Sequence, residues 1–265
     1  MMMEMPEKVI EGLNIVLDLF PKAKGIIGIE DNKKDAIAKM EALVKGDARI
    51  SVASLKTKYP QGAERSLIYA TTGRSINSSM LPADAGCIVD NVATIVAIKD
   101  AVKDGKPLFS RVVTVTGDAV ANPGNFLVRT GTNVNELIEA AGGFKKQPEK
   151  VISGGPMMGM AMFTTDVPAV KTFSCLLAMT KDEVSANQPS NCIRCGRCVS
   201  VCPQKLMPMK LSVLADHNEI DEFEKLHGAE CVECGSCSYI CPAKRNLAQS
   251  MKTGRKQVLA NRRKK

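Results

Sequence analysis

Eight of the ten cysteines stand in two copies of one spacing, and they are the residues of this chain best suited to chemistry. The copies, residues 192–203 and 231–242, both read C-x2-C-x2-C-x3-C-P. Three thiolates at this spacing fit three corners of one cubane iron–sulfur cluster as the backbone curls around it. Gly196 and Gly235 let the backbone approach the inorganic core closely. The spacing therefore predicts two [4Fe–4S] clusters.

The fourth cysteine of each run decides how the ligands divide. In bacterial two-cluster ferredoxins this cysteine binds the other cluster, so the ligation is crossed. The predicted first set is Cys192, Cys195, Cys198 and Cys241, and the second is Cys231, Cys234, Cys237 and Cys202. Clusters with four thiolate ligands leave no open position for a substrate, and they transfer one electron at a time. Two adjacent clusters would form a short electron path.

Two other interpretations of the cysteines stay open. Cys-x2-Cys pairs also bind structural zinc, but zinc commonly takes two separated pairs and does not explain a triple followed by Cys-Pro. The clusters could also be purely structural, although a structural role seldom needs two adjacent clusters. The spacing favours electron transfer over both.

The remaining chemically versatile residues are expected to be structural. Cys87 and Cys175 lie in apolar segments, which is typical of buried, inert cysteine. His217 and His227 fall on expected helices between the motifs and are interpreted as surface or capping residues. The segment 154–159, GGPMMG, does not open a helix as a phosphate loop should, so we expect a close-packed turn.

Composition and charge exclude several classes of protein. With 265 residues, 45% hydrophobic and 24% charged, the chain is typical of a globular protein and not of a disordered or collagen-like one. The net charge of +8 is concentrated at residues 244–265, which hold nine basic side chains and no acid. Aromatic residues total 4% and tryptophan is absent, so stacking platforms for single-stranded nucleic acid are scarce. We expect a basic tail on a near-neutral body.

No membrane span or export signal is expected. The sequence lacks the run of about 18 apolar residues that a spanning helix needs. The first residues, MMMEMPEKV, have neither the basic nor the apolar region of a signal peptide. A location at the cytoplasmic face of the membrane, through partners or the basic tail, is compatible with this pattern.

Periodicity divides the chain into three predicted domains. Residues 1–106 alternate helices and strands, which implies an α/β domain with a largely parallel sheet. Residues 107–168 give strands, a helix and a further strand, which is typical of a small α+β module. Residues 169–265 carry the cysteine motifs among short helices. The elements expected are helices at 6–20, 33–45, 132–141, 207–214, 220–226 and 247–259, and strands at 24–30, 49–55, 111–116, 126–129 and 151–152.

Four further segments carry a resemblance that spans nearly the whole chain: KTKYPQGAERSLIYATTGR at 56–74, NVATIVAI at 91–98, residues 113–143 and VISGGPMMGMAM at 151–162. With the cysteine motifs, they resemble the RnfC family. Its members are subunits of the Rnf complex, which couples electron flow between ferredoxin and NAD to ion transport across a membrane. The resemblance implies a multidomain α/β and α+β protein. Its parts would be a partial complex-I-flavoprotein-like domain, an SLBB module with a β-grasp-like fold and a helical two-cluster ferredoxin domain.

The same resemblance implies flavin and nicotinamide contacts in the first domain. Tyr59, Gly62 and Glu64 match a Tyr-x-x-Gly-x-Glu pattern near FMN and NADH, although Ala63 stands where complex I has a second glutamate. Asn91 and Thr94 match a segment that touches FMN. The alternative for each residue is a turn or a helix cap.

Family members carry a glycine-rich phosphate-binding stretch upstream of the point where this sequence begins. We therefore expect an N-terminally truncated product or fragment, which would bind FMN only with that segment restored. The resemblance implies an electron-transfer component of an ion-translocating oxidoreductase, with the other members of the Rnf complex and NAD(H) as partners. Two alternatives remain: an RnfC-like cobalamin reductase of a bacterial microcompartment, and an iron–sulfur nucleic-acid-binding protein suggested by the basic tail.

Overall fold

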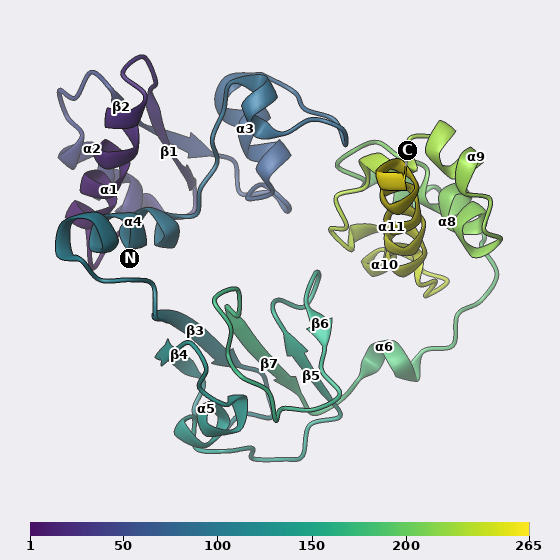
Figure 1. Cartoon of the computed structure of the whole chain (residues 1–265). Helices are drawn as coiled ribbons and strands as arrows, with labels where there is room; N and C mark the ends of the chain where they lie inside the picture. Colours follow the sequence, from purple (N-terminus) through teal and green to yellow (C-terminus); the bar gives the residue numbers. More distant parts are fainter. Residues whose placement is uncertain (265) are drawn as a thin grey trace. The chain divides into compact units, whose positions relative to one another are not determined.

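The computed structural model describes residues 1–264, so Lys265 of the basic tail lies outside the described residues. The chain divides into two compact units, Met1–Leu108 and Phe109–Lys265. The first unit is an α/β domain, and the second joins a five-stranded sheet to a group of short helices (Figure 1). The multidomain α/β and α+β architecture expected from the sequence is confirmed.

The first unit has a small parallel sheet with helices around it. Strands β1 and β2 pair in parallel from Gly25 opposite Ile50 to Glu30 opposite Leu55, as the alternation of helix and strand predicted. A side-chain carbon on Gly12 would collide with the backbone carbonyl of Ile95, so glycine lets two helices, α1 and α4, pack closely. The elements are α1 (Pro6–Leu19), β1 (Gly25–Glu30), α2 (Lys34–Leu43), β2 (Ile50–Leu55), α3 (Glu64–Thr72), η1 (Pro82–Ala85) and α4 (Val92–Asp104).

The second unit begins with a mixed sheet whose order is β4-β3-β7-β5-β6. Strand β7 lies at its centre, parallel to β3 and antiparallel to β5, so the sheet includes residues beyond 168. Helix α5 starts with a capping box between Asn133 and Glu136. The elements are β3 (Ser110–Thr116), β4 (Gly124–Arg129), α5 (Val134–Ala140), β5 (Lys150–Ser153), β6 (Met160–Ala161) and β7 (Cys175–Met179).

Short helices form the rest of the second unit. Phe223, Leu211 and Met251 are almost completely buried among them and make a separate core. The last helix packs against four earlier elements, α8, α9, η2 and α10. Figure 1 shows it among α8, α9 and α10. The elements are α6 (Glu183–Ala186), α7 (Arg197–Ser200), α8 (Pro208–Asp216), α9 (Ile220–Lys225), η2 (Gly228–Glu230), α10 (Ser236–Tyr239) and α11 (Leu247–Lys264).

Within residues 1–264, none of the helices combines the length and the apolar character that a membrane crossing requires. The basic residues Arg262, Arg263 and Lys264 belong to α11, and Arg262 forms a 2.8 Å ion pair with Glu224 of α9.

Candidate iron–sulfur centre

The two cysteine motifs fold into the same local structure. In each, a loop carries the first two cysteines, a glycine follows, and a four-residue helix carries the third. Gly196 and Gly235 have φ of 75° and 80°, in the left-handed region that glycine adopts without strain. Arg194 and Glu233, at matching loop positions, also have positive φ, 55° and 57°. The repeat in sequence is therefore a repeat in backbone conformation.

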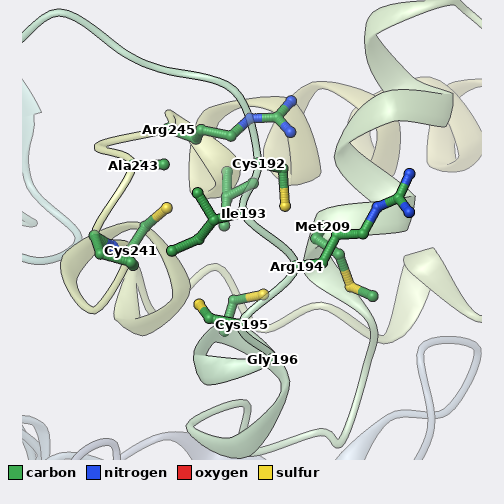
Figure 2. A pocket seen from close by; sticks show the side chains of 12 residues that line it. Cys192, Ile193, Arg194, Cys195, Gly196, Met209, Cys241, Ala243 and Arg245 are labelled. Atoms are coloured by element: carbon green, nitrogen blue, oxygen red, sulfur yellow. The ribbon is translucent and has the colours of Figure 1, made fainter.

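The first motif lines a pocket with an empty volume of about 370 Å³. Four cysteines contribute to its wall: Cys192, Cys195, Cys198 and Cys241. Figure 2 shows the sulfur atoms of Cys192, Cys195 and Cys241 on different sides of this pocket. The Ser190 amide donates a 3.0 Å hydrogen bond to the Ala243 carbonyl, and this bond holds the loop of the first motif beside the end of the second.

A second pocket of about 360 Å³ holds the other four thiols: Cys202, Cys231, Cys234 and Cys237. Leu206, Pro208 and Met251 complete much of its apolar wall. The Leu206 amide points toward the sulfur of Cys202 at 3.4 Å, and the Glu233 amide toward that of Cys231 at the same distance. Backbone donors of this kind favour the thiolate form of a cysteine.

The donor sets fit [4Fe–4S] clusters. Each pocket brings together four thiols, three from one motif and one from the other, which is the division predicted from the spacing. Among the described residues, no three Cys, His, Asp or Glu side chains lie close enough to hold a single metal ion. The thiols instead surround a cavity. The assignment of each cysteine as a ligand remains a prediction that the geometry accommodates.

The two motifs differ in burial. Residues 191–197 are exposed throughout, including Cys192 and Cys195, whereas residues 231–237 are all half-buried or buried. Burial raises the pKa of the Cys231 thiol to about 11 and that of Cys237 to about 12, with a smaller contribution from neighbouring thiols. Without a metal these two cysteines are therefore neutral thiols at physiological pH.

Helix α11 covers the second motif. Arg255 forms a 2.9 Å ion pair with Glu233 of the motif and donates a 3.2 Å hydrogen bond to the Ala229 carbonyl. A side-chain carbon on Gly235 would lie 2.7 Å from the Met157 carbonyl oxygen, so the turn at 154–159 also lies against this motif. The sequence did not indicate this cover, because Met157 and Arg255 lie far outside the cysteine run.

The five residues predicted to contact flavin lie at the starts of two helices in the first unit. Tyr59 and Gly62 precede α3, and Glu64 is its first residue. Asn91 is the N-cap of α4, and its side-chain oxygen accepts a 2.9 Å hydrogen bond from the Ala93 amide. Thr94 follows in the first turn of that helix. Asn91 therefore has the capping role that was the alternative for it, and the flavin contacts stay a prediction.

The other candidates of the sequence have structural surroundings. Cys87 and Cys175 are half-buried and not buried as expected, and burial raises the pKa of Cys175 on β7. His217 ends α8, and its Nδ1 lies 2.8 Å from the Val213 carbonyl oxygen. His227 adopts a left-handed conformation before η2. The segment 154–159 is a tight turn, with φ of 104° at Gly154.

The fold and the two cysteine-lined pockets define a modular iron–sulfur protein of the dicluster class. Three families match successive parts of the chain: the Nuo51 FMN-binding domain at residues 1–100, the SLBB domain at 112–161 and the 4Fe-4S dicluster domain at 191–245. The cofactor class predicted from the cysteines, two [4Fe–4S] clusters, agrees with the third match.

Relatives narrow this class to one family. The chain is 47% identical over 264 residues to the RnfC protein of the Na(+)-translocating ferredoxin:NAD(+) oxidoreductase complex of Acetobacterium woodii, covering 100% of this chain and 60% of that protein. It is 46% identical over 221 residues to the corresponding protein of a proton-translocating complex from Clostridium ljungdahlii, covering 83% and 48%. These relatives are RnfC proteins, and the chain spans about half the length of the curated relatives it matches.

Solved structures share the fold at low sequence identity. A chain of an NAD+-reducing [NiFe]-hydrogenase in the H2-reduced state aligns with a TM-score of 0.60 at 15% identity, covering 98% of this chain and 51% of that one. The air-oxidised state gives a TM-score of 0.58. The chain therefore shares its fold with that hydrogenase chain.

Proposed function

We propose that this chain is an electron-transfer part of an ion-translocating ferredoxin:NAD oxidoreductase complex, the kind of assembly to which its relatives belong by name. The observation that carries the proposal is the division of eight cysteines between two pockets, each with three thiols from one motif and a fourth from the other. A bound [4Fe–4S] cluster in each pocket would supply one-electron redox chemistry. Crossed ligation would keep the two clusters adjacent, as a short electron path requires.

The polypeptide has three tasks at these pockets. The thiols of each set would hold a cluster as thiolates, and the raised pKa values of Cys231 and Cys237 mean that these two would lose their protons only when metal binds. The apolar wall of the second pocket, with Leu206 and Met251, limits the access of water to that set of thiols. The left-handed glycines let the backbone curve around each site.

The first unit is proposed to contribute to a flavin and nicotinamide site. The match of residues 1–100 to an FMN-binding domain family supports this assignment, with Tyr59, Gly62, Glu64, Asn91 and Thr94 as the contacts. Because the Asn91 side-chain oxygen already caps α4, its amide nitrogen is the group available to donate to a flavin. FMN titration of this chain and of a longer homologue, each with Asn91→Ala or its equivalent, tests the assignment. An unchanged affinity in both would remove Asn91 from the site.

The partners follow from the same proposal. They are the other subunits of the complex and, for the whole protein, NAD(H). Peripheral attachment at the cytoplasmic face of the membrane would come through those subunits or through the basic end of α11, since each basic residue near anionic lipid contributes about 1 kcal/mol. Deletion of residues 252–265 should reduce salt-sensitive co-sedimentation with anionic vesicles if the tail makes this contact.

The decisive experiment for the function is reconstitution followed by redox titration. Anaerobically reconstituted protein should contain about eight iron and eight sulfide per chain. Dithionite should reduce it to a species with two magnetically interacting clusters, which a one-electron acceptor reoxidises. Two zinc ions in place of iron after anaerobic purification would overturn the proposal. Clusters that no added donor or acceptor reduces or oxidises would leave only a structural role.

A further inference from the structure

The exposed loop of the first motif carries positive charge that no carboxylate of the described protein pairs with. We define the open face as residues 191–197 together with Lys244 and Arg245, which the Ser190–Ala243 hydrogen bond holds beside them. Residues 184–215 and 234–265 contain no aspartate or glutamate. In the part of the chain that the structure describes, no carboxylate forms an ion pair with Arg194, Arg197 or Arg245.

At the equivalent loop position of the second motif, the charged side chain is neutralised by other residues of the protein. Glu233 occupies the loop position that Arg194 has in the first motif, with nearly the same φ. Its carboxylate pairs with Arg255 and lies 3.9 Å from Lys252, so the charge is satisfied inside the protein. Arg194 has the same backbone position but no oppositely charged partner of this kind among the described residues. The difference indicates that the charge of the open face is directed outward.

The open face also borders the more accessible of the two thiol sets. Cys192 and Cys195 are exposed, and Ile193 between them is 66% exposed. Arg194 and Arg245 belong to the wall of the same pocket, and Figure 2 shows their guanidinium groups away from the sulfur atoms. An exposed apolar residue that shares a pocket wall with two arginines, at the edge of a redox site, is suited to a small and transient protein contact.

We propose that the open face is the docking surface for an acidic redox protein that exchanges electrons at the first thiol set. This inference rests on the proposed function. Docking serves a one-electron exchange: one electron leaves one protein and enters the other, with no bond made or broken and no proton moved. Positive charge around the site accelerates the encounter with an acidic partner, and Ile193 provides the apolar centre of the contact. The covered second set exchanges electrons only within this chain.

The test uses charge reversal with a matched control. Arg194→Glu combined with Arg197→Glu reverses the open face. The first change copies Glu233 at the equivalent position, and the second reverses the charge at the exposed first residue of α7. Arg263→Glu combined with Lys264→Glu changes the net charge of the chain by the same amount at the end of α11, where both side chains are exposed.

The probe is an acidic bacterial two-cluster ferredoxin, and binding to the reconstituted protein is measured by calorimetry between about 0.01 M and 0.15 M ionic strength. The open-face variant should bind about tenfold more weakly at low salt and lose most of the salt dependence. The control variant should bind within about twofold of the unchanged protein. Arg194→Lys with Arg197→Lys should retain binding, because the charge is kept.

Equal weakening in both glutamate variants, or none in either, would overturn the docking surface. So would a short DNA duplex that loses binding in the open-face variant while ferredoxin binding is unchanged. Iron and sulfide content, measured on every variant, separates this result from the function itself. Protein with full clusters and an inert open face contradicts only the docking surface, whereas protein without iron contradicts the proposed electron transfer.

Discussion

The two cysteine motifs share a backbone and differ in nearly everything around it. Gly196 matches Gly235 in φ, and Arg194 matches Glu233. The residues around the motifs are nevertheless unlike. The first motif is exposed and bordered by arginines that pair with no carboxylate among the described residues, while the second is covered by α11 and carries an acid that Arg255 neutralises.

The comparison separates what the local cysteine spacing determines from what residues elsewhere in the chain determine. The spacing of cysteines and glycines determines how the thiols surround a cavity, because it determines the local backbone. Access to that cavity, the charge beside it and the pKa of its thiols depend on segments that lie elsewhere in the chain. Two equal motifs therefore give one site open to partners and one enclosed site.

Loss of Phe223 from the core beneath α11 should have the largest effect on the difference in burial between the two motifs. Phe223 is completely buried, and side-chain carbons on Gly228 and Gly254 would both collide with its ring. Phe223→Ala should lower the free energy of unfolding by about 3–5 kcal/mol and expose the second motif. Urea unfolding followed by circular dichroism measures this change. Ile193→Ala on the open face is the control and should stay within about 0.5 kcal/mol.

The thiols of the two motifs should react at different rates in the apoprotein. Cys192 and Cys195 are exposed, whereas burial both hinders Cys231 and Cys237 and raises their pKa to about 11 and about 12. Because the thiolate is the nucleophile, alkylation at pH 8 should be at least about tenfold faster at the first pair. Mass spectrometry of timed samples measures the rates. Equal rates would show that Cys231 and Cys237 are not buried in the absence of metal.

Loss of the ion pair over the second motif should have a moderate effect. Arg255→Gln removes the contact with Glu233 and leaves that carboxylate half-buried without its nearest partner. Stability should fall by about 1–2 kcal/mol, and the second set should lose iron to a chelator sooner than the first. Arg263→Gln, on the exposed end of the same helix, should change neither quantity. Faster loss from the first set would contradict the assignment of this cover.

The smallest effect is expected at the segment leading into the first motif. Asp182, the N-cap of α6, accepts two hydrogen bonds from Lys150 of β5, at 2.7 and 2.8 Å. Lys150 and Ser185 hold the pKa of Asp182 at about 2, below its ordinary value of 3.8. The depressed pKa stabilises the fold above about pH 4, and this contribution is lost as the pH falls toward 2.

Asp182→Asn should therefore lower stability by about 1 kcal/mol at neutral pH and flatten the pH dependence between about 4 and 2. Denaturant unfolding of the apoprotein across this range measures both quantities. If the variant keeps the full pH dependence of the free energy of unfolding, other carboxylates produce that dependence.

Local patterns predicted much of this structure. The periodicity indicated β1, α2, β2, β3 and α5, and the spacing indicated the two sets of thiols that line the two pockets. Strand β7 was not predicted, because its apolar residues form a strand by pairing with β3, which lies about sixty residues earlier in the sequence. The sequence pattern also did not predict which motif is exposed and which is covered, since Met157 and Arg255 contact the second motif from outside the cysteine run.

Crossed ligation is the central claim, and two single substitutions test it most directly. Cys202→Ser and Cys241→Ser should each reduce iron from about eight to about four per chain. The spectrum of reduced Cys202→Ser should retain the cluster of the first pocket, although Cys202 belongs to the first motif. Cys241→Ser should retain the cluster of the second. If instead each substitution destroys the cluster bound by the other three cysteines of its own motif, the division of ligands between the pockets is contradicted.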